Sequence, residues 1–340
     1  MVSSDGWTLV DLREPGSPTV LFRGGRVRHR TSLSRALVDA AGTRRAREIT
    51  NAVSRWADAA EHAAPEHLEF DGVECRPVDG PAGRIRAAWL ATQGSVDAEP
   101  PAAVAFDWDV DARLFRAPAG AGVLVGRPQV EVRESGITSA DALRFVEVDD
   151  TLGLVQAMLT DAPMEWSGSA TLRRPDGPVA AVASLVPAAA HRGLSGVLFE
   201  VSGAPATTPV ESMAMSTVAR MSNVHVVVMD VSKMRVLRWL TDPPAGVAWK
   251  GQRDNRDTPH PDDVARIFVV AAAVLDGSSR RGELEDIRLR RQEGGWLVVD
   301  AVGELVAGSD PPLLIISMIE RGTSDEPDPV PVDDDGHPGL

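Results

Sequence analysis

Apolar residues along the chain fall into short runs of strand length, and pairs of such runs recur at the start of three long segments. The runs are rich in Val, Leu, Phe and Trp, the residues that strands favour. They cover residues 7–10 and 19–22, 104–108 and 113–115, and 224–231 and 236–240. Each pair leads into helical sequence and then returns to strands, which predicts an α+β fold built from three successive units.

A glycine turn also recurs late in each unit. Asp79-Gly80-Pro81, Asp176-Gly177 and Gly294-Gly295 each lie between two strand-like runs. Glycine is common at such positions because hairpin turns need backbone conformations that it adopts without strain. The turns therefore support one common order of elements in the three units.

Two stretches with several Pro, Gly, Ser or Thr residues, 94–101 and 202–209, are typical of short linkers. They predict an N-terminal domain over residues 1–98, a middle domain over residues 102–205 and a C-terminal domain over residues 223–320.

Residues 206–222 connect the last two domains and are predicted to form an amphipathic helix. Thr208 suits the N-cap, Pro209 the first helical position and Glu211 the third. Apolar residues follow at helical spacing. Two explanations fit the apolar face of this helix: ordinary packing, or a role in transmitting a signal between domains.

Residues 321–340 are predicted to be a disordered, solvated acidic tail. From residue 323 onward the sequence has four Pro and six Asp or Glu residues, which leaves little apolar surface to bury. A recognition motif is the other interpretation of this tail.

The C-terminal domain has the clearest local signals. His260 is predicted to cap a helix that has proline at its first position and two Asp residues in its first turn. In the strand that follows, Ile287 and Leu289 point one way and Arg288 and Arg290 the other. This alternation predicts a strand with one solvent-facing side.

These features resemble a PAS sensor domain over residues 224–319. The resemblance is carried by paired strands with Trp239 near the end of the second, and by His260-Pro261-Asp262-Asp263, Arg288-x-Arg290 and Gly294-Gly295-Trp296. In PAS domains a five-stranded antiparallel sheet is covered on one face by helices. The space between them holds a small molecule or is filled by side chains.

The chain as a whole is similar to the actinobacterial triple sensor-domain proteins, described as PAS-GAF-PAS. The further motifs are Gly6-Trp7-Thr8-Leu9-Val10, Phe106-Asp107-Trp108, Glu165-Trp166-Ser167-Gly168 and Pro175-Asp176-Gly177. The resemblance implies three consecutive PAS- or GAF-like domains, each an antiparallel sheet covered by helices, with the middle one either GAF- or PAS-like. Proteins of that family carry no kinase, cyclase or DNA-binding output domain, and we expect none here because no length is left for one.

Composition narrows the expected partners. The chain has 35 Lys and Arg residues against 49 Asp and Glu residues, a net charge of −14. This charge repels a phosphate backbone, so nucleic acid is not an expected partner. The single cysteine, Cys75, cannot form an internal disulfide. The sequence also has no uninterrupted apolar run of about 18 residues, the length needed to span a membrane. We therefore expect a cytoplasmic protein without a membrane partner.

No combination of residues predicts a reaction centre or a metal site. Residues 193–197 lack the last glycine of the G-x-S-x-G turn, and the motifs of a phosphate loop or a zinc helix are missing. The seven histidines lack metal-ligand spacing. His225 is either an ordinary hydrogen-bonded histidine or an axial haem ligand in a PAS pocket. We therefore predict no catalytic and no metal-binding residues, name no cofactor, and interpret Cys75 as a packed thiol.

The preferred hypothesis is a non-enzymatic sensor that binds a small molecule, a separate effector protein, or both. The candidate cavity-lining residues of the C-terminal domain are Val226, Val228, Trp239, Ile267, Phe268, Ile287, Leu289 and Ile315. A one-residue error in strand register would exchange these residues for their neighbours, and the same residues are compatible with a filled core. The alternatives are a scaffold that forms a homodimer without a ligand, and an enzyme with an unfamiliar site.

Overall fold

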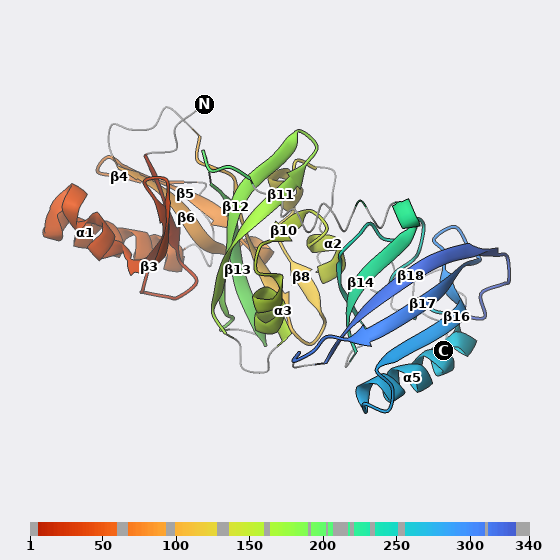
Figure 1. Cartoon of the computed structure of the whole chain (residues 1–340). Helices are drawn as coiled ribbons and strands as arrows, with labels where there is room; N and C mark the ends of the chain where they lie inside the picture. Colours follow the sequence, from red (N-terminus) through yellow and green to blue (C-terminus); the bar gives the residue numbers. More distant parts are fainter. Residues whose placement is uncertain are drawn as a thin grey trace. The chain divides into compact units, whose positions relative to one another are not determined.

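The computed structural model has a mixed α+β fold with three antiparallel β-sheets (Figure 1). It describes residues 6–59, 67–92, 99–127, 136–159, 164–189, 192–201, 203–206, 217, 221–231, 235–250, 256–309 and 312–330. The chain divides into two compact units, Met1–Gly136 with Phe145–Thr207 and Ile137–Arg144 with Thr208–Leu340. The first two sheets belong mainly to the first unit, and the third sheet belongs to the second unit.

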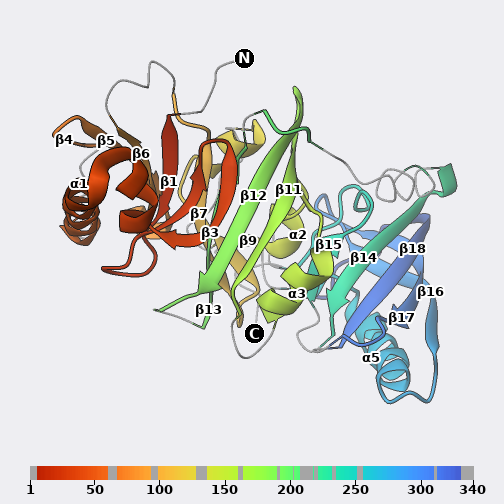
Figure 2. The same cartoon turned by 60° about the vertical axis from the view of Figure 1, so that its left-hand side comes forward.

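The first sheet has the strand order β3-β2-β1-β6-β5-β4. Its strands are β1 (Trp7–Asp11), β2 (Thr19–Arg23), β3 (Arg26–Ser32), β4 (Leu68–Phe70), β5 (Val73–Asp79) and β6 (Ile85–Thr92), with the short helix η1 (Pro81–Gly83) before β6. Helix α1 (Leu33–Ala59) covers one face of this sheet (Figure 2). Its residues Leu37, Ile49 and Val53 share a buried core with Val10 and Leu90 of the strands.

The second sheet has the strand order β10-β11-β12-β13-β7-β8-β9. Its strands are β7 (Ala103–Asp109), β8 (Leu114–Arg116), β9 (Ile137–Thr138), β10 (Val146–Val148), β11 (Trp166–Arg174), β12 (Gly177–Pro187) and β13 (Gly193–Glu200). The helical segments are η2 (Ala121–Val125), α2 (Ser139–Ala142) and α3 (Thr151–Leu159). The indole N–H of Trp108 donates to the carbonyl oxygen of Met158 at 2.9 Å, which fixes α3 next to β7.

The face of the first sheet that lies away from α1 packs against the second sheet. Trp7, Phe22 and Trp89 share one buried cluster with Val197 and Phe199 of β13. Phe22 contacts Trp89 and Phe199 edge-on, with ring centroids 6.1 and 6.0 Å apart. The compact first unit thus contains the cores of the first two predicted domains, and their boundaries at residues 98 and 102 stay a prediction.

Arg13 links the two sheets through a buried ion pair. Its Nε and Nη2 atoms donate to the two carboxylate oxygens of Asp11, both at 2.8 Å. Its Nη1 atom donates to the carbonyl oxygens of Ser184 and Ser195 at 2.7 and 2.6 Å. Both charged side chains are only 1% exposed. A charge removed from water in this way is tolerated only when it is paired and hydrogen-bonded, so the contact also fixes the position of β1 relative to β12 and β13.

The third sheet has the strand order β15-β14-β18-β17-β16. Its strands are β14 (Val224–Asp230), β15 (Arg235–Trp239), β16 (Arg281–Arg290), β17 (Trp296–Leu305) and β18 (Leu313–Ser324). Helix α5 (Pro261–Leu275) packs along β16 and β17 on one face (Figure 1). A Cβ atom at Gly282 would lie 2.5 Å from Cγ1 of Val270, so the missing side chain lets the helix approach β16 closely.

The opening strand occupies an equivalent position in all three sheets. β1, β7 and β14 each pair with the next strand of the chain on one side. On the other side they pair with β6, β13 and β18, the strands that end each segment. The predicted glycine turns are confirmed, because Gly80, Gly177 and Gly294-Gly295 connect antiparallel neighbours in the three sheets.

Cys75 lies on β5 and is buried in the core beneath α1. Burial, together with the nearby charge of Glu74, raises the pKa of its thiol to about 12. The thiol therefore stays protonated at neutral pH, as expected of a packed thiol rather than a nucleophile. Within the described residues, no helix has the length and apolar character needed to cross a membrane.

Two predicted segments fall largely outside the described residues. These are the connecting helix over residues 206–222, of which only 206, 217, 221 and 222 are described, and residues 331–340 of the predicted acidic tail. Within the described part, the structure differs from the prediction of disorder, because β18 continues to Ser324 and pairs there with Trp296.

We expect Arg13→Gln to destabilise the first unit by about 3 kcal/mol, because it leaves the Asp11 carboxylate buried without its cation. Urea unfolding followed by circular dichroism measures the change. Arg44→Gln is the matched control, since Arg44 is 93% exposed in its pair with Glu48, and we expect a change below about 0.5 kcal/mol. Equal effects of the two substitutions would show that the buried pair contributes nothing.

Candidate functional site

The eight candidate cavity residues separate into two groups in the third sheet and α5. Ile287 and Leu289 are buried in the core, and Trp239 and Ile267 pack against it. The other four residues lie outside this core cluster: Val226 and Val228 are half-buried, Phe268 is 53% exposed and Ile315 is 40% exposed.

Side chains alternate between the two faces of a strand, and this explains why Val226, Val228 and Ile315 lie outside the core. Val227 is the buried residue of this part of β14, so its neighbours Val226 and Val228 point to the opposite face. On β18 the inward positions are taken by Ile316 and Met318, which places Ile315 on the outer face. A role of any of the eight residues in lining a cavity stays a prediction. Trp239 and Trp249, with ring centroids 4.8 Å apart, fill part of the core.

His260 caps the N-terminus of α5, as the sequence predicted. Its Nδ1 atom accepts a hydrogen bond from the backbone N–H of Asp262 at 3.2 Å. Because Nδ1 is the acceptor, the proton of the neutral ring lies on Nε2, which faces Oε1 of Glu326 at 3.7 Å. The ring packs edge-on against Trp296 with centroids 4.7 Å apart. His260 thus connects the helix start to the residue that begins β17.

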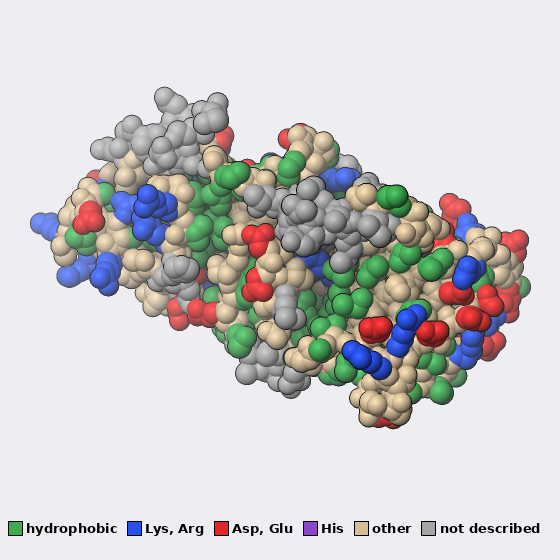
Figure 3. Space-filling view, viewed as in Figure 1, with side chains coloured by type: hydrophobic (Ala, Val, Ile, Leu, Met, Phe, Trp, Pro, Cys, Tyr) green, Lys and Arg blue, Asp and Glu red, His purple; other side chains and the backbone are tan. Residues whose placement is uncertain are grey.

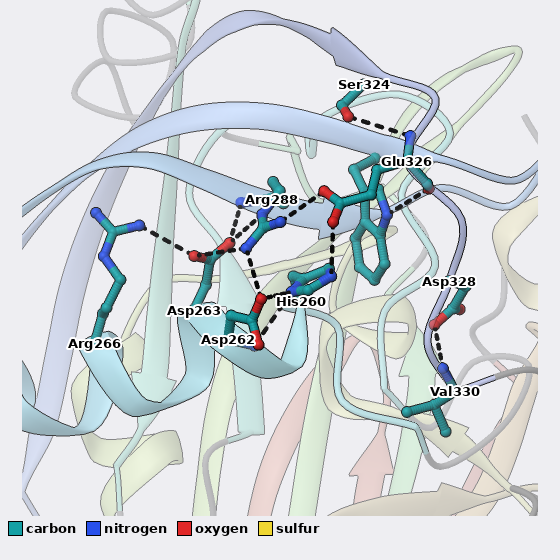
Figure 4. A network of polar contacts seen from close by, with 10 residues as sticks. His260, Asp262, Asp263, Arg266, Arg288, Ser324, Glu326, Asp328 and Val330 are labelled. Carbon is teal, nitrogen blue, oxygen red and sulfur yellow. Dashed lines mark hydrogen bonds and ion pairs between the residues drawn. The ribbon is translucent and has the colours of Figure 1, made fainter.

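Asp263, in the first turn of α5, binds Arg288 of β16 through several hydrogen bonds (Figure 4). Its Oδ2 atom accepts from the backbone N–H and from Nε of Arg288 at 3.0 and 2.9 Å. Its Oδ1 atom accepts from Arg266 at 3.0 Å. Burial alone would raise the pKa of Asp263, but the hydrogen bonds from Arg288 and Arg266 outweigh it and hold this pKa below its usual value. The hydrogen bond with Asp263 in turn raises the pKa of Arg288.

Two more arginines lie beside Arg288, and we call Arg256, Arg288 and Arg290 the arginine cluster. Arg290 is buried and stacks on Trp296, with its guanidinium carbon 5.1 Å from the ring centroid. Its Nε atom donates to the carbonyl oxygen of Asp257 at 3.3 Å. Within the cluster, Arg288 is therefore held by Asp263, and Arg290 is held by a backbone oxygen and by stacking on Trp296.

Residues 325–330, which we call the terminal segment, bind this cluster. Oε2 of Glu326 accepts from Arg288 at 2.6 Å, and Oδ2 of Asp328 pairs with Arg256 at 3.0 Å and also with Arg290. The carbonyl oxygen of Glu326 accepts from the Trp296 indole at 2.9 Å. The structure therefore corrects the prediction of a disordered solvated tail for these residues, because their carboxylates find cations on the folded domain.

The sequence contains a signal for this contact that composition alone hides. Arg288 and Arg290 are two residues apart, and so are Glu326 and Asp328. In an extended chain, side chains two residues apart lie on the same side. Matching the spacing of the two pairs would have suggested the contact, whereas the richness in Pro and acidic residues suggested disorder.

His225 on β14 also has ordinary polar partners. One ring nitrogen contacts the carbonyl oxygen of Asp242 at 2.7 Å and the other contacts Glu320 at 3.0 Å. The interpretation as a hydrogen-bonded histidine is thereby supported over a haem ligand, because both nitrogens are engaged. Among the described residues, no group of three or more His, Cys, Asp or Glu side chains is arranged to hold a metal ion.

Comparison with known proteins gives matches that bear on the fold. The C-terminal third matches a family model. Residues 212–307 fit the model described as "Rv3651-like, C-terminal domain". The fold is similar to the crystal structure of an uncharacterised protein from Mycobacterium tuberculosis, with a TM-score of 0.67 and 16% identity over 93% of this chain and 96% of that chain.

The remaining comparisons add little. A structure of an RNA-binding light-oxygen-voltage receptor has a TM-score of only 0.25 and 12% identity, over 64% of this chain and 95% of that chain. No curated protein sequence matches. The family model covers only residues 212–307, and at 16% identity the mycobacterial structure shows a shared fold alone.

We expect Asp263→Asn to lower the free energy of unfolding by about 2 kcal/mol at pH 7, because Arg288 loses a charged acceptor. The pKa of Asp263 is depressed in the folded state, so its contribution is present above the unfolded-state pKa of about 3.9 and is lost as the pH falls further. The wild type and the variant should therefore converge in acid. Urea unfolding at several pH values tests this, with the exposed Asp286→Asn as control. A difference that is independent of pH would contradict the ion pair.

Proposed function

We propose that the protein is a non-enzymatic cytoplasmic sensor whose tandem PAS- or GAF-like domains bind a small molecule, a separate effector protein, or both. The observation that carries the proposal is the repeated architecture. In each of the three antiparallel sheets, the first strand of the segment (β1, β7 or β14) lies between the second strand of that segment and its last strand.

The third sheet gives the strongest support. Its five antiparallel strands, with α5 on one face, match the arrangement that the resemblance to PAS domains implies. The matching family model covers the same region, from residue 212 to residue 307. The first two sheets support PAS- or GAF-like domains in the same way, with α1 covering the first sheet and α3 fixed to the second.

The contacts of the polar residues favour sensing or binding over catalysis. His260 uses Nδ1 to cap α5, and Asp263 is saturated by Arg288 and Arg266. Groups held in this way position structural elements and are poorly available for proton transfer. The single cysteine is buried and protonated, which is compatible with a reducing compartment.

A sensor is expected to be stabilised by its ligand, because a molecule that binds only the folded state raises the melting temperature. Native mass spectrometry of the purified protein, followed by melting curves with a small-molecule library, should reveal such a ligand. Ala301→Leu fills space next to the buried core of the third sheet and should abolish the ligand-induced rise in melting temperature if the ligand lies there. Ala265→Leu is the matched control because Ala265 is exposed on α5. Finding neither a ligand nor a bound protein would contradict sensing.

A homodimeric scaffold is the second candidate, and the outer face of the third sheet favours it. Ile315 and Ile319 are 40% and 38% exposed, and they pair in register with Val228 and Val224. Hydrophobic side chains gather over β14 and β18 on the face seen in Figure 3. An exposed group of apolar side chains of this kind is typical of protein interfaces.

The scaffold hypothesis predicts that Ile315→Glu/Ile319→Glu converts a dimer into a monomer, because the charges would have to be buried at the interface. Sedimentation velocity over a range of concentrations measures the state. Val123→Glu, at an exposed position of η2, should leave the dimer intact. A wild-type protein that stays monomeric at the highest concentration would exclude this candidate.

A further inference from the structure

The terminal segment is held on the C-terminal domain almost entirely by charge. Asp325, Glu326, Pro327 and Pro329 are exposed, and only Asp328 and Val330 are partly buried. The anchoring contacts are the carboxylates on the arginine cluster, one hydrogen bond from Trp296 and one from Arg256 to the carbonyl oxygen of Val330 at 2.9 Å. A segment held by ion pairs and few apolar contacts is released easily, because salt and water compete for such contacts.

The surface beneath the segment is, by contrast, built into the folded domain. With the terminal segment in place, the side chains of Arg290 and Arg256 are only 5% and 12% exposed. Arg288 is held by Asp263, and Arg290 is stacked on Trp296. The supports of Arg288 and Arg290 come from α5 and β17, so they do not depend on the terminal segment.

Release of the segment would leave the arginine cluster without the carboxylates that neutralise part of its charge. Arg290 and Arg256 would lose Asp328, and Arg288 would lose Glu326. Neighbouring guanidinium groups that lose their carboxylates repel one another and attract another anion. In a chain with a net charge of −14, this cluster would then be a local site for negatively charged groups.

We infer that the arginine cluster and Trp296 form a docking site for an acidic peptide in an extended conformation, and that the terminal segment occupies this site in cis. The peptide carries two carboxylates two residues apart, as in Glu326-x-Asp328. One carboxylate binds Arg288 and the other binds Arg256 and Arg290, while a backbone carbonyl accepts from Trp296. This inference deepens the proposed function, on which it rests only for the existence of a separate effector, since it states the chemistry by which such an effector binds.

The site is therefore autoinhibited, and its affinity for a partner is set by competition with the terminal segment. A tethered segment acts at a high effective concentration. An external peptide must overcome this concentration, so the wild-type protein binds it weakly. Neutralising Glu326 and Asp328 removes the competitor and leaves the arginines in place.

The test uses the full chain with the substitutions Glu326→Gln/Asp328→Asn and a fluorescent peptide with the sequence of residues 323–330. Fluorescence anisotropy at low salt should show binding that is at least about tenfold tighter for the variant than for the wild type, and that weakens as salt is added. Glu285→Gln/Glu304→Gln is the matched control. It removes the same charge from exposed positions and should bind the peptide as weakly as the wild type does.

Two further arms make the result decisive. Adding Arg256→Gln to the double variant should abolish binding, and a peptide with Gln and Asn in place of its Glu and Asp residues should not bind. Circular dichroism confirms that each variant is folded. Equal binding by the double variant and the wild type, or no binding by a folded double variant, would overturn the docking site. Neither result depends on a small-molecule ligand, so the sensor hypothesis would be judged separately by the melting experiments.

Discussion

The organisation of the C-terminal domain depends on how the guanidinium groups of Arg288 and Arg290 are neutralised. Both residues lie on β16, an edge strand, and both need carboxylates because they are largely removed from water. The carboxylates come from elements far apart in sequence, Asp263 at the start of α5 and Glu326 and Asp328 after β18. The charges of Arg288 and Arg290 therefore fix the start of α5, the β16–β17 hairpin and the end of β18 relative to one another.

The first unit uses the same principle at another place. Arg13 leaves β1 and reaches the backbone of two strands of the second sheet, while Asp11 neutralises it. Apolar contacts, among them that of Phe22 with Phe199, also join these sheets, but apolar contact is tolerant of small shifts. Hydrogen bonds from a buried guanidinium are directional. They therefore select one relative position of the two sheets from the many that apolar packing alone would allow.

Local signals in the sequence were sufficient for much of the fold. The paired strands, the glycine turns and the cap by His260 depend on residues close together in the chain, and the structure has them where the sequence placed them. The inward face of β14 and β18 was not predictable in the same way. Val226 and Val227 are equally apolar, and only the packing against Met318 and Val299 decides which of them is buried.

The terminal segment escaped prediction for a related reason. Its composition resembles that of a disordered chain, and composition has no information on the position of Arg256, Arg288 and Arg290 in space. The contact depends on a strand order that brings Ser324 next to Trp296. Long-range charge pairing of this kind becomes visible only when the register of β17 and β18 is known.

The position of the last strand has a consequence for how the protein is made. In each sheet the strand that is synthesised last is not at the margin but lies between the first strand and the preceding hairpin partner. While the ribosome is still adding residues up to β18, the β14–β15 hairpin and the β16–β17 hairpin each have an unpaired edge, and neither can join the other. Such edges are sites at which nascent chains associate wrongly. Each sheet can be completed only after its last strand is made, so a pause in translation before β18 would leave these edges of the third sheet unpaired for longer.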